Sequence, residues 1–466
     1  MMMTFNLALR NLLRNRRRSL ATLLAMAIGS TSILLFGGYS TNISYSMHTA
    51  YVQNGGHLQI QHRDFYLYGS GNPTAYGISD STEILAAIQT DEVLRDMVLV
   101  VTPTLQFGGI AGNYSAGVSR TMIGNGLVAE DINRLRRWND FSMRTGYPVS
   151  ALEGSAPDAA IVGTGLARVL QLCDALKIAR CPKPESEQRV SGDELPADIA
   201  MLSLQEKSTD SASMTVSPRK IEVLASTAAG APNVASLEVI RAEDQGFKEL
   251  DEVYVMMHLV KAQQLIYGKS PPKVTSIILQ LRHSDQIPAA QARLVPILAK
   301  FSARQPLTVM DFRTLNPFFT QTIQLFDTIF GFIFSLIGAI VLFTVSNTMN
   351  TAVVERTVEI GTLRAIGLRR AGIRRLFVTE GALLGLFGAV LGVVLALVVA
   401  AIINQMGLTW SPPGGVEPLP LELRVWGETR MILGTTLGLI CIAILSAWWP
   451  AYRAAKLNVV DALRHV

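Results

Sequence analysis

Residue types that could form a catalytic or metal site are sparse in this sequence. The segment 268–270 reads Gly-Lys-Ser, like the end of a phosphate-binding loop, but that motif needs a glycine at position 263, where the chain has Gln263. His57 and His62 bracket a strand-like segment, and their odd spacing points them to opposite faces. The sequence contains neither an H-E-x-x-H nor a G-x-S-x-G motif. We therefore expect no catalytic residue and no metal site.

The three cysteines divide into one isolated residue and one nearby pair. Cys441 lies in an apolar run, where a thiol acts as packing. Cys173 and Cys181 lie close together in a polar region, and in an oxidising compartment they could form a disulfide. Two free thiols are the alternative, because sequence spacing does not show that the two side chains meet.

A polar segment at 347–367 carries the most informative pattern. Read as a helix, it places three apolar residues on one face: Val353, Ile360 and Leu363. Glu355 and Glu359 form a like-charge pair that destabilises an isolated helix by about 0.2–0.5 kcal/mol, and Gly361 adds about 1 kcal/mol relative to alanine. Such a helix is better explained if it docks on a partner that supplies cationic and apolar contacts. A solvated loop is the alternative.

The composition of the chain predicts a membrane protein. Of its 466 residues, 49% are hydrophobic and only 17% are charged, whereas soluble domains average about 25% charged. Four apolar stretches are close to the roughly 20 residues that cross a bilayer, at 19–40, 328–349, 376–403 and 431–449. The first could instead be a cleaved signal peptide, but its apolar part is longer than a typical signal core.

The distribution of Lys and Arg predicts the orientation of these spans. Residues 1–18 hold five arginines and the loop 350–375 holds six, whereas the loop 404–428 holds one. The positive-inside rule therefore places both termini and the 350–375 loop in the cytoplasm. The net charge of +5 is explained by this clustering, so nucleic acid is not an expected partner.

Residues 41–320 then form a large domain outside the cytoplasm. Alternation predicts strands at 57–62 and 274–281, and helical periodicity predicts helices at 161–172 and 289–301. A polar segment at 185–218 reads as a long loop. Residues 40–53 and 318–327 could extend the first and second spans as helical stalks, although a loop at 40–53 fits nearly as well.

A stripe of glycines follows one face of the third predicted span. Its members are spaced by four, three and four residues: Gly381, Gly385, Gly388 and Gly392. Small residues at this spacing let helices approach closely, although glycine is also simply frequent in membrane helices. The packing partner could be a helix of this chain or of a second chain.

Several motifs at the membrane ends together resemble the FtsX/MacB-type ABC transporter permeases. The run E-R-x-x-E-I-G-x-L-R-A-I-G extends from Glu355 to Gly367. Further matches are the segments 8–15 (A-L-R-N-L-L-R-N), 380–385 (E-G-A-L-L-G), 450–456 (P-A-Y-R-A-A-K) and 461–464 (D-A-L-R). One departure is the segment 457–460, which lacks the proline usual in that family.

The resemblance implies a membrane α-helical fold of four spans, with an α+β extracytoplasmic domain inserted between the first and second. It divides the chain into a cytoplasmic amphipathic N-terminal helix (1–18), the spans 19–40, 328–349, 376–403 and 431–449, the inserted domain (41–320), a coupling-helix loop (350–375), a short outer loop (404–428) and a cytoplasmic tail (450–466). The family pattern makes eight residues contacts for an ATPase: Glu355, Arg356, Glu359, Ile360, Gly361, Arg364, Ala365 and Gly367.

The same resemblance implies the partners and the activity. ATP and Mg would be bound by a separate dimeric ATPase, and this chain would hold no cofactor. A second permease chain, identical or related, and an extracytoplasmic adaptor or carrier would complete the assembly in lipid, in a bacterial inner membrane. The expected function is ATP-driven export or extraction of a lipoprotein, lipid or amphiphile, and the alternative is mechanotransmission to an outer enzyme or sensor. A membrane-anchored enzyme or receptor independent of ATP is a third reading.

Overall fold

The computed structural model describes residues 2–14, 16–144, 148–178, 181, 218–410 and 418–457. The chain divides into two units. The helical unit comprises Met1–Ser46, Phe318–Trp410 and Leu419–Val466, and the inserted domain comprises Met47–Pro317 with Ser411–Pro418. Each unit is described below by itself.

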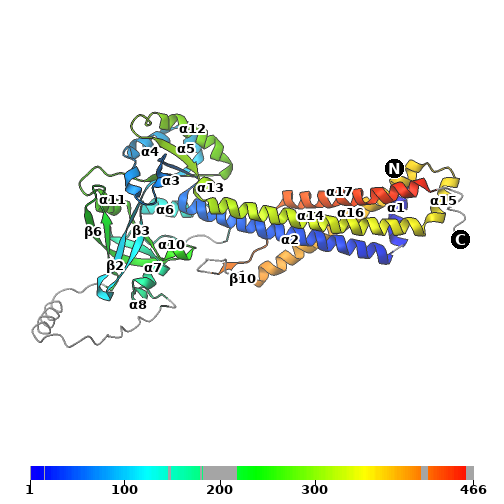
Figure 1. Ribbon diagram of the computed structural model, residues 1–466, viewed down its shortest axis with the longest axis horizontal. Helices are drawn as coiled ribbons and strands as arrows, with labels where there is room; N and C mark the ends of the chain where they lie inside the picture. Colours follow the sequence, from blue (N-terminus) through cyan, green and yellow to red (C-terminus); the bar gives the residue numbers. More distant parts are fainter. Residues whose placement is uncertain are drawn as a thin grey trace, which may run out of the picture. The chain divides into compact units, whose positions relative to one another are not determined.

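Four long helices form the helical unit: α2 (Arg16–Gly55), α14 (Pro317–Glu355), α16 (Arg370–Met406) and α17 (Thr429–Lys456). All four are long and apolar enough to cross a membrane, and within the unit they run side by side (Figure 1). The N-terminal helix α1 (Met2–Arg14) and the short helix α15 (Thr357–Ala365) complete it, together with the two-stranded β10 (Thr409–Trp410) and β11 (Leu419–Pro420). The helix α2 is continuous through 40–53, and α14 is continuous through 318–327.

The glycine stripe of α16 packs against two neighbouring helices of the same chain. A methyl group on Gly381 would collide with Ala447 of α17, and one on Gly385 would lie 2.8 Å from the Ala443 Cβ. Farther along, Gly388 faces Met26 and Gly392 faces Ser30, both on α2. Of the two partners left open by the sequence, the structure places a helix of this chain against every member of the stripe.

The inserted domain is built around one long strand that belongs to two sheets. The first part of β2 (Val98–Asn113) pairs with β8, and β8 continues through β1 to β9. The second part pairs with both β3 and β5, and the order β2-β3-β7-β4-β6-β5 closes into a ring. The remaining bounds are β1 (Leu58–His62), β3 (Val118–Leu127), β4 (Ala159–Gly163), β5 (Lys220–Ser226), β6 (Pro232–Glu243), β7 (Tyr254–His258), β8 (Ser276–Leu281) and β9 (Leu307–Asp311).

Helices pack around these sheets and join their strands (Figure 1). They are α3 (Phe65–Tyr68), α4 (Ser81–Thr90), α5 (Glu92–Met97), α6 (Ala129–Arg136), α7 (Thr164–Val169), α8 (Cys173–Leu176), α10 (Lys248–Asp251), α11 (Leu259–Tyr267), α12 (Ile287–Ala299) and α13 (Phe312–Leu315). The predicted strands at 57–62 and 274–281 correspond to β1 and β8, and the helix predicted at 289–301 corresponds to α12 with Pro296 inside it.

The helix predicted at 161–172 is wrong at its start. Residues 161–163 end the strand β4, every residue of which is buried, and the helix α7 covers only Thr164–Val169. Successive side chains point to opposite faces of the sheet, and all five are buried, so both faces of the strand are covered and its sequence is a continuous apolar run. Such a run cannot be distinguished from a buried helix by periodicity. Most of the loop predicted at 185–218 lies outside the described residues.

Candidate functional site

The helix α14 ends at Glu355, and the chain turns at Arg356 before α15 begins. The Arg356 backbone has φ −107° and ψ 19°, outside the helical range. The segment predicted as one helix is therefore two, with a break between Glu355 and Glu359. Val353 and Ile360 are nevertheless buried in one hydrophobic cluster, with Leu363 packed against it, as the helical face predicts.

The break directs the Arg356 side chain into the interior of the helical unit. Its Nη1 donates to both oxygens of Glu380 on α16, at 3.1 and 3.4 Å. Its Nη2 donates to the backbone oxygen of Asn11 on α1 at 3.1 Å, and the Asn11 side-chain amide donates to Glu380 at 2.6 Å. Three helix segments thus meet at one buried ion pair, whose side chains are 7% and 2% exposed.

Two exposed ion pairs flank this buried one. Arg18 on α2 donates to Glu355 through Nη1 and Nη2, at 2.8 and 2.5 Å, and Arg14 on α1 binds Glu359. The sequence predicts that a partner protein supplies these cations. The structure supplies them from the N-terminal arginines of the same chain, so that reason for a partner no longer holds.

A second arginine fixes the other end of α15. Arg364 donates to the backbone oxygens of Leu457 at 2.7 Å and Ala455 at 3.4 Å. These carbonyls lie at the C-terminus of α17, where a helix leaves acceptors unpaired and favours a positive charge. The helix α15 is therefore held at both ends by arginine side chains, and its orientation is fixed relative to α16 and α17.

The exposed surface around α15 carries apolar side chains beside the charged ones. Four of its side chains are exposed by 39% to 80%: Val354, Val358, Ile366 and Leu368. Ala365 and Gly367 are also exposed beside them, and Gly367 has φ +105°, a conformation suited to glycine. We call the six residues 354, 358 and 365–368 the α15 surface. Exposed apolar side chains beside a helix whose orientation is fixed are suited to an interaction surface.

The eight predicted contact residues fall into two groups. Glu355, Glu359, Ala365 and Gly367 are exposed, whereas Arg356, Ile360 and Gly361 are buried and Arg364 is half-buried. The buried members support α15 from inside and do not reach the α15 surface. Asn11 and Glu380 lie in the motifs 8–15 and 380–385 but are not among the predicted contact residues, although a carboxylate near the end of an apolar span is itself a signal of function.

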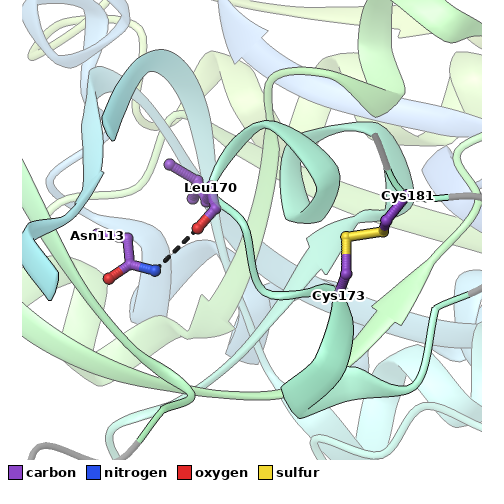
Figure 2. Close-up of a disulfide and its surroundings, with 4 residues drawn as sticks. All are labelled: Asn113, Leu170, Cys173 and Cys181. Atoms are coloured by element: carbon purple, nitrogen blue, oxygen red, sulfur yellow. Dashed lines mark hydrogen bonds between the residues drawn. A yellow bond between two sulfur atoms is a disulfide. The ribbon is translucent and has the colours of Figure 1, made fainter. Parts of the chain in front are cut away.

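The remaining candidate residues lie in the inserted domain. A disulfide joins Cys173 to Cys181 (Figure 2). His57 is buried, and its Nε2 lies 3.1 Å from the Ser284 hydroxyl, while its Nδ1 accepts a hydrogen bond from the Leu281 backbone N–H at 3.0 Å. These buried contacts indicate a structural role for His57. Gly268-Lys269-Ser270 follows α11, outside any strand-to-helix turn.

Comparison with known protein families finds a match in the part of the chain that carries the α15 surface. Residues 328–459 match the family model described as "FtsX-like permease C-terminal". This part of the chain is therefore that of an FtsX/MacB-type ABC permease. Among its relatives, the lipoprotein-releasing system transmembrane protein LolC of Neisseria meningitidis is 29% identical over 244 residues, which are 50% of this permease and 56% of LolC.

Other relatives match this permease over shorter parts. The ABC transporter permease YtrF of Bacillus subtilis is 36% identical over 139 residues, 29% of this chain and 30% of YtrF. The macrolide export ATP-binding/permease protein MacB of Escherichia coli is 36% identical over 144 residues, 31% of this chain and 20% of MacB. The permease thus matches about half or less of the length of these curated relatives. The extracellular domain of the transporter YknZ aligns with 55% of the chain at 13% identity and a TM-score of 0.28.

Proposed function

We propose that this permease transmits ATP-driven motion from a separate ATPase to its inserted domain. The ATPase would be a dimer that holds ATP and Mg, and this chain would contribute no catalytic group. The observation that carries the proposal is the α15 surface, a set of exposed apolar residues on and beside a helix that Arg356 holds at one end and Arg364 at the other. A partner that pushes on α15 would move α16 through Glu380 and α17 through its C-terminus.

The proposed topology places the α15 surface and both termini in the cytoplasm. Besides the arginine distribution, aromatic and cationic side chains gather where the predicted third and fourth spans border the same loop region. Arg374 lies over the Trp448 ring, Arg453 over Trp449 and Lys456 over Tyr452, at 4.6 to 5.8 Å from the ring centroids. Such belts mark membrane–water interfaces. The inserted domain would then lie outside the cytoplasm, in the periplasm of a bacterium with two membranes.

The work done outside would be export or extraction of a lipoprotein, lipid or amphiphile. The likeness to LolC, a lipoprotein-releasing protein by its name, favours a lipid-modified cargo. The helices α2 and α14 continue past the predicted spans to Gly55 and from Pro317, so each can carry displacement along a rigid element. The same continuity serves the second candidate, mechanotransmission to an outer enzyme or sensor without a cargo. A second permease chain and an adaptor or carrier would complete either assembly.

Affinity purification of the tagged chain from its native membranes tests the proposal. We expect an ABC ATPase to co-purify with the wild type, and Ile366→Asp to abolish that association, because Ile366 is 80% exposed and belongs to the α15 surface. Val295→Asp is the matched control, since Val295 is a 63% exposed residue of α12. Retention of the ATPase by Ile366→Asp, or its absence from the wild-type preparation, would contradict the proposal. Other proteins retained by the wild type would identify the cargo or the regulated enzyme.

A further inference from the structure

The inserted domain contains a cavity of about 520 Å³ whose lining is strongly cationic. It lies between α7, α8 and the last residues of β6, with four basic side chains among its described lining: Arg168, Lys177, Arg219 and Arg241. The described lining includes no carboxylate. The volume falls within the roughly 300–1,000 Å³ range of small-molecule sites. A concave surface with this charge is suited to an anion.

One wall of the cavity is formed by residues 175–178. In the sequence they lie between Cys173 and Cys181, the two cysteines of the disulfide that Figure 2 shows. The Ile178 backbone N–H donates to the Cys173 oxygen at 3.0 Å, and Lys177 adopts the left-handed conformation that closes the turn. Arg219 Nε donates to the Ala175 oxygen at 3.1 Å, which ties the same loop to the start of β5. The wall is therefore fixed by a covalent bond and by backbone contacts.

Three of the basic side chains form no ion pair with the described part of the chain. Arg168, Lys177 and Arg241 have no carboxylate oxygen within 4.0 Å among the described residues. The Nε of Arg168 is moreover buried and has no hydrogen-bond partner there. A buried donor without an acceptor is destabilising by about 1–3 kcal/mol.

The rest of the lining is largely apolar and suits a ligand that also has an apolar part. Leu176, Ile178 and Ile240 contribute apolar surface beside the cations. An anion without an apolar part, such as inorganic phosphate, would leave that surface wet, whereas a short hydrocarbon chain would cover it. We propose that this cavity binds an amphiphilic anion, with its phosphate or carboxylate head on Arg168, Lys177 and Arg241 and its chain against the disulfide-held wall. The proposal does not depend on the coupling function.

Binding of soluble eight-carbon amphiphiles to the full chain in zwitterionic nanodiscs tests it. Octyl phosphate and octanoate carry the anionic head, octanol lacks the charge, and octyltrimethylammonium reverses it. Equilibrium dialysis, with uptake by empty nanodiscs subtracted, gives the affinities. Loss of hydrogen bonds to a charged group corresponds to about tenfold in affinity or more. We therefore expect both anions to bind at least about tenfold more tightly than octanol, and inorganic phosphate to compete only weakly.

Matched charge variants locate the site. Arg168→Gln/Lys177→Gln/Arg241→Gln should lower octyl phosphate affinity at least about tenfold. Arg63→Gln/Lys269→Gln/Lys300→Gln removes the same charge elsewhere in the domain and should leave the affinity unchanged. The proposal is overturned if octanol binds as tightly as octyl phosphate, or if the two triple variants bind alike. An unchanged thermal unfolding midpoint verifies that each variant is folded, and the single variant Arg168→Gln replaces the triple if it is not.

Removal of the disulfide tests the proposal in a second, independent way. Cys173→Ser/Cys181→Ser frees the wall, so we expect weaker binding of octyl phosphate with its preference over octanol reduced. Cys441→Ser, which removes the exposed thiol of α17, is the control. Wild-type affinity in the double serine variant would exclude the disulfide-held wall from the site.

Discussion

The guanidinium of Arg356 and the carboxylate of Glu380 form an ion pair in the interior of the helical unit, with Nη1 3.1 Å from Oε1. Arg356 occupies the break between α14 and α15, and Glu380 lies on α16, so the pair joins three helices. Asn11 bonds to both residues and adds α1. The element that would receive force from an ATPase is thus connected internally to the helices that would transmit it.

We predict that breaking this pair is far more destabilising than removing it. Arg356→Met or Glu380→Leu leaves one buried charge unpaired and should lower the free energy of unfolding by about 3–5 kcal/mol. The double variant Arg356→Met/Glu380→Leu should lose less than either single variant, because no unpaired charge remains. Unfolding of the detergent-solubilised chain, followed by circular dichroism, measures the stability of the wild type, the two single variants and the double variant. Arg14→Gln breaks the exposed pair with Glu359 and should change stability by no more than about 1 kcal/mol. Additive losses in the double variant would contradict the interpretation.

The glycine stripe gives a second prediction, on helix packing within one chain. A side chain at Gly385 or Gly388 would meet Ala443 or Met26 at 2.8 and 2.7 Å from its Cβ. Gly388→Val should therefore lower the free energy of unfolding by about 1–3 kcal/mol through overpacking. Gly434 on α17 has no atom within 4 Å of an added Cβ, so Gly434→Ala should be neutral or stabilising. If Gly388→Val instead left stability unchanged and altered only self-association, the contact would lie between chains.

The parts of this structure that the sequence predicts well are those with a local signal. The four spans follow from apolar length alone, and β1 and β8 follow from alternation and flanking turns. The contact between Arg356 and Glu380 has no such signal, because it depends on how α16 crosses the α14–α15 break. Glu380 alone looks like a charge near the end of a span.

Two further differences have physical causes of the same kind. The acidic pair Glu355 and Glu359 suggested a cationic partner protein, since nothing in the local sequence shows that Arg14 and Arg18 lie beside it. The strand β4 was read as helix because a strand covered on both faces is apolar at every position. Both differences arise where tertiary contacts decide what a short segment does.

The Cys173–Cys181 disulfide provides a third prediction. Closing a loop of this length restricts the unfolded chain by about 2–3 kcal/mol in the chain-entropy model, since the two cysteines are 8 residues apart. Cys173→Ser/Cys181→Ser should lower the free energy of unfolding of the inserted domain by that amount, and a reductant should have the same effect on the wild type alone. Limited proteolysis across a denaturant series measures it. An equal response to reductant in wild type and variant would contradict the prediction.

The buried His57 provides a fourth prediction, on pH. Burial first, and the neighbouring His48 second, lower the pKa of His57 from 6.5 to about 3. The unfolded chain therefore binds a proton below about pH 6.5 that the folded domain excludes until about pH 3, and stability falls as pH decreases through that window. The loss attributable to His57 is about 2 kcal/mol at pH 5 relative to neutral pH.

Proteolysis of the inserted domain in denaturant, at pH values from 7 to 4.5, measures how steeply stability depends on pH. His57→Gln keeps an acceptor for the Leu281 N–H but does not titrate. The variant should therefore be less stable at neutral pH, and its free energy of unfolding should depend less on pH. A slope as steep as that of the wild type would assign the pH dependence to other groups.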